Sequence, residues 1–193
     1  MASSDLIRWG GLAALLAGVL WIVLGLVSLA ITRPVAGPAF QGTFSYYLVE
    51  VIFSLACIGM LGGLVSLYVV QARGLGRLGT VGFNLAFTGT ALIVISTVTT
   101  LLLGREVLGI LFVVGMLGAL VGFALLGGAT LRARVLPQWC GIVLLVSVLG
   151  FPVYFVFDVY GGGIVFGVIW LALGYALLSN RGQAGGEQPS RVS

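Results

Sequence analysis

Six long stretches of the chain carry no charged side chain and consist mostly of apolar residues. The apolar residues run on continuously and do not alternate with polar ones, which favours helices over transmembrane barrel strands. A helix needs about 20 such residues to cross the ~30 Å hydrocarbon layer of a membrane. The pattern therefore predicts six transmembrane helices, at about residues 10–32, 46–71, 78–103, 106–131, 137–157 and 162–180.

The connections between these stretches are mostly short and contain Gly, Pro and Arg. Short connections make consecutive helices pack antiparallel. The exception is the segment 32–43, which we expect to be an extended loop, and residues 181–193 have the composition of a disordered tail. The predicted fold is all-α: one polytopic transmembrane domain over residues 1–180, built as a six-helix bundle with Gly-rich helix packing.

The composition narrows the class of protein. Of 193 residues, 60% are hydrophobic and 7% are charged, whereas about 25% of the residues of a soluble domain are charged. This excludes a soluble globule, a disordered chain and a nucleic-acid binder. The chain has no His and no Lys, so it lacks the side chains for a Ser-His relay or a Schiff base. Its two cysteines cannot complete a zinc site or an iron–sulfur cluster, and we expect no metal and no cofactor.

The distribution of arginine predicts the orientation. With six spans, one side of the membrane holds seven arginines: Arg8, Arg73, Arg77, Arg132, Arg134, Arg181 and Arg191. The other side holds Arg33 and Arg105. Because positive residues accumulate on the cytoplasmic side, we expect both termini to be cytoplasmic.

Glycine is abundant, at 31 of 193 residues, and in lipid small residues let helices approach closely. The candidates for helix packing recur at spacings of four or seven: Gly11, Gly18, Gly25, Gly59, Gly63, Gly118, Gly122, Gly163 and Gly167. One interpretation is that these glycines close a single bundle. The other is that the stripe on the first helix is kept for another subunit, in a homo-oligomer or a larger membrane complex, because the opposite face carries the bulky Leu15, Trp21 and Ile22.

Ionisable groups within spans are candidates for function. The residues that could line a path for a solute or ion are Glu50, Asn84, Thr88, Asp158, Tyr47 and Tyr154. Glu50 and Asp158 would form an outward-facing acidic vestibule, with tyrosines at its mouth. The alternative is an ordinary membrane interface, with the tyrosines in the aromatic belt. Pro152 is expected to kink the fifth helix, and such a kink could border a cavity.

The third span is the most polar. Asn84 and Thr88 lie four residues apart and share a helix face, which could serve a solute path. Hydroxyl groups in such a span more often donate to the carbonyl four residues earlier or to a neighbouring helix, and we expect this of the serines and threonines. Asn84 is the exception, because an amide in hydrocarbon needs a partner.

One short stretch resembles a known type of sequence. An Arg-rich loop runs into Leu-Pro-x-Trp and a glycine-bearing helix, through Arg132, Arg134, Leu136, Pro137, Trp139 and Gly141. This resembles a cytoplasmic boundary element of small, uncharacterised six-span bacterial integral membrane proteins. The resemblance implies a bacterial inner-membrane location and brings no activity or catalytic residue.

Three functions are compatible with these residues. The first is a non-enzymatic structural or accessory membrane subunit, or a binder of a lipid or apolar solute, with membrane lipids as its partners. The second is a small transporter or channel that uses Glu50, Asp158 and the polar third helix. The third is a lipid-modifying enzyme, whose acid and base could only be Glu50, Glu106 or Asp158.

Overall fold

The computed structural model describes residues 2–30, 43–72, 74–104, 108–157 and 162–179, without the side chains of 2–4 and 150–157. This part contains six helices and no strand: α1 (Ala2–Ala30), α2 (Phe44–Gln71), α3 (Gly76–Leu103), α4 (Gly109–Ala133), α5 (Gln138–Phe157) and α6 (Gly162–Ser179). Five of them, α1 to α4 and α6, are long and apolar enough to cross a membrane. In α5 the stretch with described side chains, Gln138–Leu149, is also apolar. The predicted fold class, an all-α membrane bundle, is confirmed.

The observed helices start and end within three residues of the predicted spans, except at the start of α1. This helix begins at Ala2, whereas the sequence predicts a span from residue 10. The first turns of α1 contain polar residues, with Asp5 in the first turn, where a negative charge stabilises the helix dipole. Hydropathy finds the part of a helix that is apolar, and a helix can continue beyond it.

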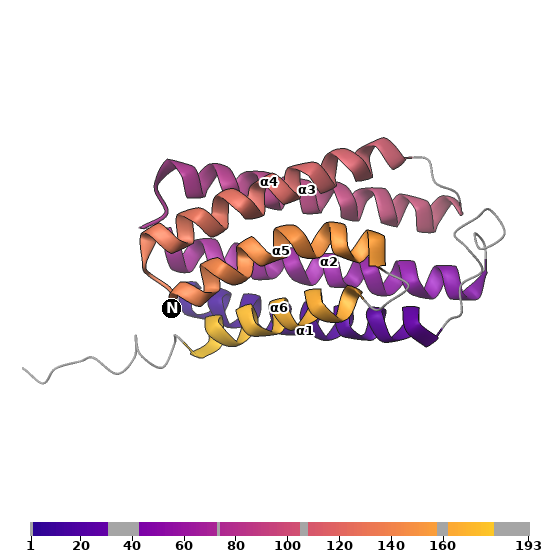
Figure 1. The fold of residues 1–193 in the computed structure, drawn as a ribbon, viewed down its shortest axis with the longest axis horizontal. Helices are drawn as coiled ribbons and strands as arrows, with labels where there is room; N and C mark the ends of the chain where they lie inside the picture. Colours follow the sequence, from indigo (N-terminus) through magenta and orange to yellow (C-terminus); the bar gives the residue numbers. More distant parts are fainter. Residues whose placement is uncertain (1, 31–42, 73, 105–107, 158–161, 180–193) are drawn as a thin grey trace, which may run out of the picture.

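The helices form a closed ring in chain order. Each helix packs against the next one along the chain, and α6 returns to pack against α1. In Figure 1 the helices run roughly along one axis, with α2 and α5 between the α1/α6 pair and the α3/α4 pair. The described part of the predicted loop 32–43 is residue 43 alone, and the predicted tail 181–193 lies outside the described residues.

Close packing between α1 and α6 depends on the glycine stripe of α1. A Cβ on Gly18 would lie 2.6 Å from the backbone nitrogen of Leu171, and a Cβ on Gly25 would lie 2.7 Å from that of Ile164. Gly11 faces the side chain of Leu178. The interpretation that this stripe is kept for another subunit is therefore wrong for these glycines, because α6 already covers them. Of the bulky residues predicted for the opposite face, Leu15 and Ile22 also meet α6, at Gly174 and Gly167, and Trp21 is fully buried.

The other predicted glycines lie at contacts of the same kind, with one exception. Gly163 and Gly167 approach the backbone of α1, Gly59 and Gly63 approach alanines of α1, and Gly122 approaches the backbone of Ala86 in α3. The exception is Gly118, whose added Cβ would meet its nearest atom at 3.6 Å, an ordinary contact.

Other glycines bring α4 close to α3. A Cβ on Gly115 would lie 2.7 Å from the carbonyl oxygen of Gly89, and a Cβ on Gly82 would lie 2.6 Å from the backbone nitrogen of Leu126. These distances leave no room for a side chain at either position. The seven-residue spacing of Gly82 and Gly89 thus marks the face of α3 that packs against α4.

Aromatic side chains fill the interior of the ring. The Trp21 ring of α1 makes edge-on contacts with Phe53 of α2 and Phe166 of α6, with ring centroids 5.4 and 4.7 Å away. Its Nε1 donates a hydrogen bond to the Met60 sulfur at 3.2 Å. From the other side of the ring, Phe123 of α4 approaches Trp170 of α6 at 6.1 Å. Because these side chains are buried, the described interior is a packed core.

We expect Gly18→Ala to destabilise the protein by about 1–3 kcal/mol, because the added methyl group meets backbone atoms that cannot move aside. The matched control is Gly128→Ala, since an added Cβ at Gly128 in α4 has nothing within 4 Å. The control should be neutral or more stable by about 0.5–1 kcal/mol, the usual helix preference for Ala over Gly. Unfolding titrations in detergent measure both, and equal effects of the two changes would contradict the close contact.

Candidate functional site

The structure describes only part of the predicted acidic vestibule. Asp158 lies outside the described residues, as do Arg33, Arg105 and Glu106. Tyr154 and Pro152 belong to α5, in the stretch whose side chains are not described. The predicted pairing of Glu50 with Asp158 and the predicted kink at Pro152 therefore stay predictions.

The described part of this region lies at the start of α2. Thr43 caps the helix, since its Oγ1 accepts a hydrogen bond from the Tyr46 backbone nitrogen at 3.2 Å. The rings of Tyr46 and Tyr47 are in contact, with centroids 5.6 Å apart, and the Tyr47 hydroxyl lies beside Gly104 at the end of α3. Glu50 follows one turn later, half-buried and with an interaction partner. Within the described residues, no group of three His, Cys, Asp or Glu side chains could hold a metal ion.

Most hydroxyl groups of α3 behave as the sequence predicts, and the exception is Thr88, which has no hydrogen-bond partner among the described residues. Thr90, Thr97, Thr99 and Thr100 each donate a hydrogen bond to the carbonyl oxygen four residues earlier. Ser54 of α2 donates to the Thr97 hydroxyl at 3.0 Å, which joins α2 to α3. These groups are satisfied within the bundle, so they offer no free lining for a solute path.

Asn84 and Thr88 do not line an internal path. Both are exposed, whereas the buried residues of α3, such as Gly82, Ala86 and Gly89, lie on the opposite face. The part of the transporter hypothesis that depends on this pair is therefore wrong. The glycines of α3 turn toward α4, so the Asn84 face is left on the outside of the bundle.

A groove lies where α2 ends and α3 begins. It is lined by Ala72, Gly76, Arg77, Thr80 and Val81 and has a volume of about 540 Å³. The turn that forms it is closed by hydrogen bonds from two backbone nitrogens, those of Gly74 and Leu75, to the Gln71 carbonyl oxygen. Gly76 has a φ of 59°, a conformation that few other residues adopt at low cost.

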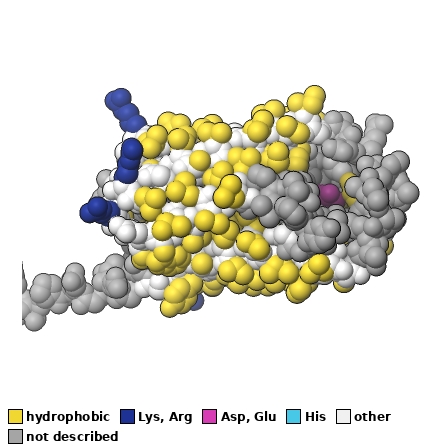
Figure 2. Space-filling model, in the orientation of Figure 1, with side chains coloured by type: hydrophobic (Ala, Val, Ile, Leu, Met, Phe, Trp, Pro, Cys, Tyr) yellow, Lys and Arg dark blue, Asp and Glu magenta, His cyan; other side chains and the backbone are white. Residues whose placement is uncertain are grey.

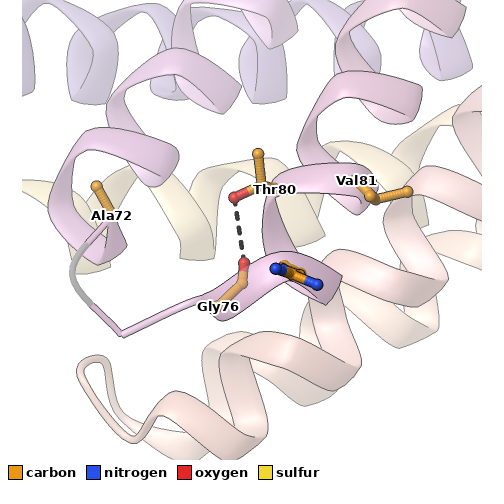
Figure 3. Close-up of a pocket in the computed structure, with 5 residues that line it drawn as sticks. Ala72, Gly76, Thr80 and Val81 are labelled. Atoms are coloured by element: carbon orange, nitrogen blue, oxygen red, sulfur yellow. Dashed lines mark hydrogen bonds between the residues drawn. The ribbon is translucent and has the colours of Figure 1, made fainter.

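The polar atoms of the groove belong to α3. The Thr80 hydroxyl donates to the Gly76 carbonyl oxygen at 3.1 Å (Figure 3). No side chain caps the start of α3 at Leu75, so the first backbone N–H groups of this helix have no side-chain acceptor. The groove thus combines the Arg77 guanidinium, a helix N-terminus and the apolar side chains of Ala72 and Val81.

Arginine side chains collect at this end of the bundle. Figure 2 shows the basic side chains gathered at one end of the apolar surface. In the described residues they are Arg8, Arg77, Arg132 and Arg134. We call this the arginine end, and it is the end that the sequence predicts to face the cytoplasm.

The sequence did not single out the groove. Arg77 entered only through the count of charges, and the approach of Ala72 to Arg77 and Val81 depends on how the chain turns from α2 into α3. Two further buried groups were also missed: the Gln71 side-chain amide and the Trp170 Nε1 atom have no hydrogen-bond partner among the residues that the structure describes. No pattern in the sequence marks them, because an unpaired buried group shows only when its neighbours are placed.

Comparisons with models of protein families, with curated proteins and with solved structures find no match for this chain.

Cys57 offers a test for a water-filled path from Glu50 into the bundle. It follows Glu50 by seven residues, about two helical turns, so the two share a face, and it is fully buried. In a Cys140→Ala variant, which leaves Cys57 as the single cysteine, we expect a small water-soluble thiol reagent to label the protein only after denaturation. An added cysteine at the exposed Ala72 is the positive control. Labelling of Cys57 at a similar rate in the folded protein would support the part of the transporter hypothesis that depends on Glu50.

Proposed function

We propose that this chain is a non-enzymatic, multi-pass protein of a bacterial cytoplasmic membrane, with a structural or accessory role and six spans. In this proposal both termini lie in the cytoplasm. Its ligand is an anionic phospholipid, held at the groove of Ala72, Gly76, Arg77, Thr80 and Val81.

The observation that carries this proposal is the position of Arg77. Its guanidinium borders an apolar groove at the arginine end, the level at which lipid headgroups would meet the bundle. Arginine matches phosphate geometry well, because its planar donors can bind two phosphate oxygens together. The uncapped N-terminus of α3 favours the same anion.

The apolar side of the groove supports a lipid over a free anion. Val81 and the neighbouring Leu78 are about half exposed, so an acyl chain could lie along them while the headgroup stays near Arg77. The interior offers less to a ligand, since the Trp21 and Phe123 side chains that fill it are fully buried.

The test compares two arginine variants. We expect Arg77→Gln to reduce the amount of anionic lipid that stays bound during purification by roughly fivefold, since one arginine near a membrane surface contributes about 1 kcal/mol. Arg8→Gln removes an exposed charge at the same end, outside the groove, and should change lipid retention little. Mass spectrometry of the purified protein in mild detergent measures the lipid.

Two outcomes would contradict the proposal. One is equal loss of lipid in the Arg77 and Arg8 variants, which would indicate a general charge effect. The other is equal retention of zwitterionic and anionic lipid by the unchanged protein, which would remove the role of the phosphate charge that Arg77 is proposed to bind.

A further inference from the structure

Two polar side chains lie on the outer surface of α3, far from either end of the helix. Asn84 and Thr88 are both exposed, and neither has a hydrogen-bond partner among the described residues. With a rise of 1.5 Å per residue, they lie about 12 and 18 Å along α3 from Gly76. With lipid headgroups at the level of Arg77, as in the proposed function, this depth falls within the ~30 Å hydrocarbon layer.

No other helix shows this feature in the described part of the chain. The remaining exposed polar side chains, such as Arg132 and Tyr175, lie in the first or last two turns of a helix or in a connection. The middle of each other helix exposes apolar residues, for example Val19 on α1 and Leu117 on α4.

A lipid-exposed amide carries a high free-energy cost, since acyl chains offer no hydrogen-bond partner. A threonine hydroxyl can avoid this cost by donating to the carbonyl four residues earlier, as Thr90 does on the same helix. An asparagine amide has two N–H donors and a carbonyl oxygen. It therefore needs a partner from outside its own helix.

The neighbours of the pair form a seam suited to a second helix. Val81, Asn84, Thr88, Ala91 and Ile95 follow one another at spacings of three and four residues, the repeat that keeps a straight line of contact between two helices. Thr88 and Ala91 are small, which allows close approach in a membrane. Val81 and Ile95 are each about half exposed at its two ends.

We propose that this seam (Val81, Asn84, Thr88, Ala91 and Ile95) binds the same seam of a second copy of the chain, which makes the protein a parallel dimer in the membrane. Two copies inserted with the same orientation place their α3 helices parallel, with equal residues at equal depth. A two-fold axis along the membrane normal then sets Asn84 opposite Asn84. Two amides are self-complementary, since each can donate to the carbonyl oxygen of the other.

Cross-linking tests the geometry of the dimer. We expect Thr88→Cys to form a disulfide-linked dimer on mild oxidation in membranes, because the two-fold axis brings the two positions together. Val19→Cys is the matched control, at a similar distance from the start of its predicted span and on the exposed face of α1. The native Cys57 and Cys140 are buried, so the unchanged protein should not cross-link.

The second measurement concerns the amide itself. We expect Asn84→Leu to raise the dimer dissociation constant in lipid vesicles by about tenfold, as two lost interhelical hydrogen bonds imply. Leu85→Ala, at an exposed neighbour outside the seam, should leave it unchanged. Energy transfer between fluorescently labelled copies, followed as the lipid is diluted, measures the dissociation constant.

Three outcomes would overturn the dimer. They are equal cross-linking at Thr88→Cys and Val19→Cys, an unchanged dissociation constant in Asn84→Leu, and a Thr88→Cys cross-link to a different protein in place of a second copy. Arg77 is unchanged in all these variants, so the lipid proposal stands or falls by its own measurement.

Discussion

Close approach of helix backbones at glycine is the constraint on which this bundle depends. Lipid chains are as apolar as the helices, so no hydrophobic force holds helix to helix, and dispersion contacts must do so. These contacts are strong only where backbones meet, and Gly18, Gly82 and Gly115 each leave room for backbone atoms and for nothing larger. The glycine face therefore determines which side of a helix packs against its neighbour. This fixes which of the other side chains on that helix are buried and which are exposed.

The glycine contacts divide the ring into two groups of three helices. In one group α1 packs closely against α2 and α6, and in the other α4 packs closely against α3 and α5. Larger side chains join the groups: Ser54 to Thr97, Tyr68 stacked on Phe83 at 4.3 Å, and Phe123 beside Trp170. The two groups of helices therefore meet through side chains. Side chains can change rotamer, so we expect the distance between the groups to vary more readily than the distance between helices that meet at glycine.

Hydropathy was enough to predict the helices, because a run of apolar residues has one stable form in lipid. It could not predict the start of α1, which continues into polar residues, or which neighbour each glycine face meets. From the sequence, the glycine stripe of α1 could face either another helix of the bundle or another subunit. The structure shows that it faces α6, because the helices form a closed ring. The outward position of Asn84, however, could have been predicted from the sequence. It lies about 200° around the helix from Gly82, so packing of the glycine face alone places the amide outside.

The polar residues of α3 differ between its buried and its outer face: the buried ones are satisfied on their own helix, and Asn84 on the outer face is not. Thr97 and Thr100 are buried, and each satisfies its hydroxyl on its own helix, so the bundle can hold them without any water or solute. Asn84 has no such local solution, because a helix offers its own side chains carbonyl oxygens and no free N–H except at its start. The start of α3 has those N–H groups, but there they lie beside Arg77 and would attract an anion. The helix α3 thus carries two sets of polar groups without a partner among the described side chains, the Asn84 amide and the N–H groups at its start. Both lie on the outside of the ring.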